Sequence, residues 1–158
     1  MIGKRSRRLT PETALDAVLG YTIFNDGSVR AYQRKGAQWT PGKNFDRTGS
    51  LGPVIVTPDE VPPGAMGLGV RTLVDGDVLQ NGNTSDMIFS VADILVTVSA
   101  FMTLEPGDVI AMGTPAGVGF ARKPPRWLVP GMSCSIEIEG IGTLTNPIFA
   151  DSALEHYK

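Results

Sequence analysis

The even spread of glycine and proline constrains the fold of this sequence more than any other feature. The chain has 19 Gly and 12 Pro among 158 residues, and neither type gathers in one segment. Because both residues interrupt helices and favour turns, little room is left for long helices. The pattern predicts a single β-rich domain over residues 1–158, built from short strands joined by tight turns.

Composition narrows the class of protein further. Hydrophobic residues make up 42% of the chain, enough for a real core, and the formal net charge is −2. The basic run Lys4, Arg5, Arg7 and Arg8 is interpreted as a solvated face, so no nucleic-acid partner is expected. The single Cys134 excludes a disulfide within the chain, and no apolar run approaches the roughly 20 residues of a membrane helix. We expect a soluble cytoplasmic protein without a membrane partner.

Alternating apolar residues predict two hairpins and three further strands. Residues 68–80 alternate around Asp75-Gly76, a strong hairpin signal, and residues 134–138 and 141–144 form a closing hairpin through Glu139-Gly140. The further strands are expected at residues 21–24, 54–56 and 109–112.

Two helices are expected. The first begins after the cap-like run Thr10-Pro11-Glu12-Thr13 and ends at Gly20. The second runs from Ser85 or Ser90 to Met102, with apolar residues at helical spacing and Asp86 able to cap its start.

Polar residues beside glycines follow three of the predicted strands or turns. They are Asp26 with Arg30 and Gln33, then Gly42-Lys43, then Gly113-Thr114. If they converge, the carboxylate suits a hard cation such as Mg²⁺, and the cations and backbone amides suit an anionic substrate. On propensity alone, Asp26 is a turn former and Arg30 and Lys43 are surface charges, so both interpretations stay open.

Other kinds of site find little support. The glycines of residues 113–119 lack the lysine and Ser/Thr of a phosphate-binding loop, so we exclude a nucleotide site. His156 is the only histidine and lies near the end of the chain, where no catalytic role is expected. One His and one Cys give no basis for a zinc site or for Cys/His catalysis.

Ordered sequence blocks resemble the catalytic domain of the fumarylacetoacetate hydrolase family. Residues 20–30 (GYTIFNDGSVR) resemble its signature G-Y-T-x-x-N-D-x-S-x-R, although Gly27 and Ala31 depart from the usual residues, a bulkier residue and an Asp. Further blocks agree in order, at residues 38–46, 51–53, 83–89, 104–119 and 138–147.

The resemblance implies a β-rich α+β fold of the mixed β-roll type, a homodimer, and an enzyme that uses Mg²⁺ or Mn²⁺, with Ca²⁺ as a substitute in crystals. Such enzymes act on 2-oxo or β-diketo acids by hydrolysis, decarboxylation, isomerisation or hydration, in part in aromatic catabolism. Carried over by motif, the expected site has Asp26 as a metal ligand, Lys43 and Arg30 as catalytic residues, and three substrate-binding residues, Gln33, Gly113 and Thr114.

The resemblance also implies groups that this chain does not supply. In the family, a Glu-x-Glu strand runs directly into the segment matched by residues 1–4, and an acid/base His and Glu come from further upstream. We expect that Asp26 alone remains of three carboxylates and that a lone monomer is poorly stable. Three explanations stay open: a start placed too late, which we favour, one half of a split enzyme, or an inactive homologue that only binds.

Overall fold

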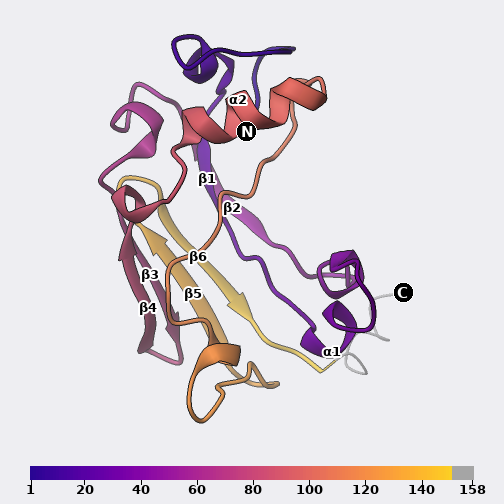
Figure 1. The fold of residues 1–158 in the computed structure, drawn as a ribbon. Helices are drawn as coiled ribbons and strands as arrows, with labels where there is room; N and C mark the ends of the chain where they lie inside the picture. Colours follow the sequence, from indigo (N-terminus) through magenta and orange to yellow (C-terminus); the bar gives the residue numbers. More distant parts are fainter. Residues whose placement is uncertain (151–158) are drawn as a thin grey trace.

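The computed structural model describes residues 1–150 as two antiparallel sheets with few helices (Figure 1). This is the β-rich α+β class that the sequence predicts. The strands are β1 (Tyr21–Phe24), β2 (Leu51–Val56), β3 (Gly69–Val74), β4 (Asp77–Asn83), β5 (Ser133–Ile138) and β6 (Gly142–Pro147). The helices are α1 (Arg30–Gln33) and α2 (Val91–Phe101), with single 3₁₀ turns η1 (Ala14–Ala17), η2 (Thr40–Gly42), η3 (Pro63–Ala65), η4 (Thr84–Asp86) and η5 (Gly119–Ala121).

Both predicted hairpins are confirmed within the four-stranded sheet, whose order is β4-β3-β5-β6. The turn between β3 and β4 has Asp75 at φ 51° and Gly76 at φ 88°, the left-handed pair that a tight Asp-Gly hairpin needs. β5 pairs with both β3 and β6, so the two hairpins join into one surface.

The two-stranded sheet β1-β2 packs beside β6, and one of two cores lies between them (Figure 1). Ile23 of β1 is 1% exposed and contacts a cluster with Val56, Ile141 and Leu144. This packing fixes the end of β1, and therefore the loop that carries Asp26.

The second core lies under α2. Ile2, Ala14, Val91, Leu95 and Leu104 form its buried centre. The backbone amide of Ile2 donates to the carbonyl of Asp108 at 2.8 Å, and Ser6 and Leu104 exchange two hydrogen bonds of 2.9 Å. The first residues of the chain therefore belong to this core. In residues 1–150, no helix is long and apolar enough to cross a membrane.

The helix predicted between Thr10 and Gly20 is wrong, because only the 3₁₀ turn η1 forms there. The amide of Gly3 donates to Ala17, the amide of Leu19 donates to Met1, and Ile2 bridges to Val18. Pairing with the first residues of the chain takes the backbone groups that a longer helix would use.

Two further expectations are corrected. Residues 109–112 form no strand, and Ile110 and Met112 pack against the α2 core instead, so their apolar character reflects burial rather than strand pairing. Helix α2 is confirmed, but its cap is Ser90, whereas Asp86 belongs to the capping box of η4.

Candidate active site

Asp26 and Lys43 form an ion pair at one wall of a recess. Asp26 follows β1, and Lys43 ends the 3₁₀ turn η2. The Lys43 ammonium donates to Asp26 Oδ2 at 2.6 Å, with the two side chains 30% and 49% exposed respectively. A pair this exposed adds little to stability. Its main effect is to hold an ammonium group and a carboxylate side by side at an accessible surface.

Gly42 brings the lysine into this position. The amide of Val29 donates to the carbonyl of Gly42 at 2.9 Å, and a Cβ on Gly42 would lie 2.5 Å from that of Gln33. Only glycine permits η2 to pack this closely on α1. The local backbone contact thus sets the place of Lys43 relative to the residues of α1.

Arg30 and Gln33 lie together on α1. The Arg30 guanidinium donates to Gln33 Oε1 at 2.6 Å, and Gln33 is only 4% exposed. Arg30 also lies over the ring of Phe120, 4.9 Å from its centroid. Since Phe120 belongs to η5, Arg30 connects α1 to the loop of residues 113–126.

Thr114 lies on that loop and contacts Gln80 of β4. The Gln80 amide nitrogen donates to the Pro115 carbonyl at 2.7 Å and to Thr114 Oγ1 at 2.9 Å. A carbonyl can only accept, so this contact fixes which end of the Gln80 amide faces the loop. The Thr114 hydroxyl therefore accepts from Gln80 and keeps its own hydrogen free to donate to another group.

The loop is held on β4 by Arg122 and by a close glycine contact. The Arg122 guanidinium donates to the carbonyls of Leu79 and Gly117. Gly117 has φ 105°, and a Cβ there would overlap the Leu79 carbonyl oxygen. Gly113, at φ 106°, is likewise left-handed, which suits the turn beside Thr114.

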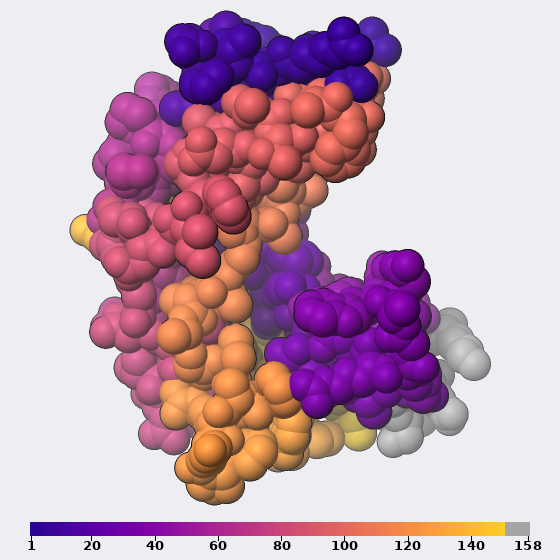
Figure 2. Space-filling model, in the orientation of Figure 1, coloured from indigo at the N-terminus to yellow at the C-terminus, as the bar shows by residue number. Residues whose placement is uncertain are grey.

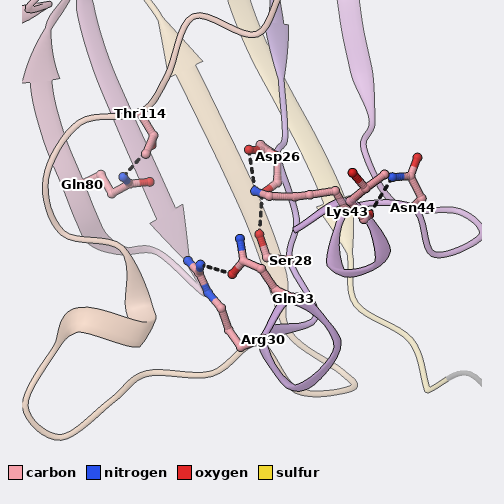
Figure 3. A network of polar contacts seen from close by, with 9 residues as sticks. Asp26, Ser28, Arg30, Gln33, Lys43, Asn44, Gln80 and Thr114 are labelled. Atoms are coloured by element: carbon pink, nitrogen blue, oxygen red, sulfur yellow. Dashed lines mark hydrogen bonds and ion pairs between the residues drawn. The ribbon is translucent and has the colours of Figure 1, made fainter. Parts of the chain in front are cut away.

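Figure 2 shows a recess bounded by the segment of residues 25–50, by α2 and by the loop of residues 113–126. Figure 3 shows Asp26 and Lys43 on one side, Thr114 and Gln80 on the other, and Arg30 extending its guanidinium group between them. Asp26 contacts Lys43 and Arg30 contacts Gln33, whereas Thr114 contacts Gln80 rather than any of the other predicted residues. Two further concavities, lined by residues such as Met66 and Ser90 or by Arg71 and Glu137, lie away from the predicted residues.

Asp26 is the right type of ligand for a divalent cation, but one carboxylate alone does not make a metal site. Its carboxylate offers the hard oxygen that Mg²⁺ or Mn²⁺ prefers. In residues 1–150, however, no three His, Cys, Asp or Glu side chains gather into a group able to hold a metal ion. A bound ion would therefore also need water, substrate oxygens or other groups as ligands.

The sequence analysis missed Gln80, Phe120 and Arg122. Gln80 lies in a strand where alternation predicts only a face, and Phe120 and Arg122 lie in a loop without a periodic pattern. No local signal marks them, because each has a partner in a distant segment. His156 lies outside the described residues.

Comparison with known proteins identifies the family of this chain. The family model for the fumarylacetoacetate (FAA) hydrolase C-terminal region matches residues 1–149. The chain belongs to the fumarylacetoacetate hydrolase family. Among curated relatives, it is 43% identical over 150 residues to a mitochondrial oxaloacetate tautomerase of Xenopus laevis, covering 94% of this chain and 47% of the relative. It is 45% identical over 148 residues to an oxaloacetate tautomerase of Bacillus subtilis, covering 94% and 49%.

Solved structures of the family agree with the fold. A fumarylacetoacetate hydrolase from Exiguobacterium antarcticum superposes with a TM-score of 0.91 at 47% identity, covering 95% of this chain and 53% of that one. Maleylpyruvate hydrolase from Sphingobium sp. SYK-6, in complex with manganese(II) and pyruvate, gives a TM-score of 0.80 at 34% identity, covering 94% and 51%. The chain spans about half the length of the relatives it matches.

Proposed function

We propose that this chain forms the catalytic region of an enzyme that converts a small 2-oxo acid through a metal-stabilised enolate. The observation that carries the proposal is the recess itself, where the Lys43–Asp26 pair faces the Thr114 hydroxyl. Relatives named as oxaloacetate tautomerases, and a neighbour solved with manganese(II) and pyruvate, support this class of substrate. Tautomerisation and hydration pass through such an enolate when a proton moves, whereas decarboxylation and C–C hydrolysis form it when the carbon–carbon bond breaks.

Lys43 is proposed to stabilise negative charge on the substrate oxygen. Its ammonium group is held by Asp26 at 2.6 Å, and the lysine side chain is 30% exposed, so the group is both oriented and accessible. A positioned cation stabilises a developing oxyanion more than the neutral ground state, which lowers the barrier.

Thr114 is proposed to bind the substrate carboxylate. Because Gln80 already donates to its oxygen, the free hydroxyl hydrogen can donate to a carboxylate oxygen. The adjacent Gly113 lets the backbone approach the same anion closely. Arg30, oriented by Gln33, adds positive charge between the two walls.

Asp26 is proposed as one ligand of the divalent cation, Mg²⁺ or Mn²⁺. When bound, such an ion polarises the oxygens of the 2-oxo acid and favours its enolate.

Oxalate binding tests this assignment, because oxalate mimics a planar enolate of a 2-oxo acid. Calorimetric titration in the presence of Mg²⁺ should give a clear affinity that Lys43→Ala lowers by roughly tenfold or more, as expected for a lost charge-assisted hydrogen bond. Lys35→Ala is the matched control, since the Lys35 ammonium lies 3.7 Å over the Tyr32 ring instead. Equal affinities of the Lys43→Ala variant and the unchanged protein would refute the assignment.

A binding domain without catalysis is the second candidate. The observation that favours it is that no three His, Cys, Asp or Glu side chains in residues 1–150 gather into a group able to hold a metal ion. Such a domain would bind oxalate without accelerating any exchange of substrate protons, whereas the enzyme would do both.

A further inference from the structure

Two guanidinium groups share the ring of Phe120. Arg30 begins α1 and lies 4.9 Å from the ring centroid, and Arg34, which directly follows α1, lies 4.4 Å from it. The two groups are therefore within about 10 Å of each other, since each lies less than 5 Å from the same point. Phe120 reaches them from η5.

Neither group is neutralised within the part of the chain that the structure describes. Lys43, Arg71 and Arg126 each pair with a carboxylate, but no ion pair in residues 1–150 involves Arg30 or Arg34. The side-chain hydrogen-bond partner of Arg30 there is Gln33, which is neutral. Two nearby like charges repel each other, and an anion placed beside both would relieve that repulsion.

We propose that Arg34, held beside Arg30 by Phe120, selects substrates with a second carboxylate. This inference rests on the proposed function, in which the 2-oxo acid end of the substrate lies between Lys43 and Thr114. A distal carboxylate would then meet the guanidinium pair, since the planar fork of arginine can donate two parallel hydrogen bonds to it. Arg34 is a specificity residue in this arrangement and takes no part in forming the enolate.

A matched pair of ligands isolates this contribution. The five-carbon acids 2-oxoglutarate and 2-oxopentanoate differ only in the terminal carboxylate, and calorimetry with Mg²⁺ measures the affinity of each. The unchanged protein should prefer 2-oxoglutarate, and Arg34→Gln should reduce that preference by about tenfold while leaving the affinity for 2-oxopentanoate unchanged. Arg34→Lys, which keeps the charge but loses the fork, should retain part of the preference.

Two further variants control the experiment. Lys35→Gln removes the same charge from the neighbouring residue, whose ammonium group lies over Tyr32, and should leave the preference intact. Phe120→Leu keeps the apolar bulk but removes the aromatic face, and should lower the preference as Arg34→Gln does.

The outcomes separate this inference from the proposed function. Equal binding of the two acids by the unchanged protein, or equal effects of Arg34→Gln and Lys35→Gln, would overturn the role of Arg34 and leave the proposed function standing. Binding of neither acid would overturn both.

Discussion

At the residue scale, Gln80 controls what the Thr114 hydroxyl can do. Its amide nitrogen contacts the Pro115 carbonyl and Thr114 Oγ1 together, so the threonine hydrogen is directed elsewhere. Gln80, which lies outside the family-like motifs, thus orients the hydroxyl of Thr114, which lies within one of them.

Gln80→Ala is therefore expected to weaken oxalate binding by roughly tenfold, because Thr114 loses its fixed orientation and the Pro115 carbonyl loses its donor. Asn81→Ala is the control: Asn81 is the next residue of β4, points to the opposite face and lines a concavity away from the site. Calorimetry on both variants checks this, and equal losses would contradict the role of Gln80.

Cys134 gives a pH-dependent prediction. The side chain is 4% exposed, and burial raises the pKa of its thiol. Since the folded pKa lies above the unfolded one, the stabilisation is complete below the unfolded pKa, near 8.5 in peptides, and is lost as pH rises through the folded pKa. Urea unfolding at pH 7.5 and pH 10 should show a larger loss for the unchanged protein than for Cys134→Val. Equal losses would contradict burial of the thiol.

At the scale of elements, α2 is capped at both ends. The cap at its start can be predicted from the local sequence, whereas the cap at its other end cannot. Ser90 and Asp93 form a capping box at its start, a short-range pattern. At its other end, Arg7 donates to the carbonyls of Ser99 and Ala100 at 2.5 Å each. The basic run at the start of the chain thus supplies a cap from more than 90 residues away, which local spacing cannot predict.

Ser90→Ala should lower the free energy of unfolding by about 1 kcal/mol, the usual cost of losing a helix N-cap. The Ser90 hydroxyl also lowers the pKa of the Asp93 carboxyl group. The carboxylate of Asp93 therefore adds to stability above its unfolded pKa, and this stabilisation is lost as pH falls through its folded pKa. Urea unfolding at neutral pH measures the change, with Ser85→Ala in η4 as the control. No difference between the two variants would contradict the capping role.

At the scale of the whole molecule, the sequence predicts hairpins better than it predicts the recess. Asp75-Gly76 and Glu139-Gly140 encode their turns locally, and both hairpins form as expected. The predicted helix before Gly20 fails because residues 1–3 compete for its backbone. The wall that carries Thr114 lies opposite Lys43 only through contacts between distant segments, and Phe120, which joins the walls, has no sequence signal.

Exposed apolar residues beside α2 predict self-association, consistent with the homodimer proposed from family resemblance. Ile88 and Phe89 directly precede the helix and are 91% and 63% exposed. Burying them against another copy would remove apolar surface from water. Light scattering should detect a dimer that the double variant Ile88→Ser, Phe89→Ser dissociates, whereas Val78→Ser, on edge strand β4, should not. A monomer at all concentrations would contradict this.

Proton exchange at the substrate carbon tests the enolate most directly. In D₂O with Mg²⁺, proton NMR follows the replacement of the C3 hydrogens of a 2-oxo acid such as oxaloacetate by deuterium, which reports an enolate formed by loss of a C3 proton. The protein should accelerate this exchange over buffer, and Lys43→Ala should slow it by about 100-fold or more, whereas Lys35→Ala should not. Exchange no faster than in buffer with Mg²⁺ alone, while oxalate still binds, would contradict the enolate and leave a binding domain.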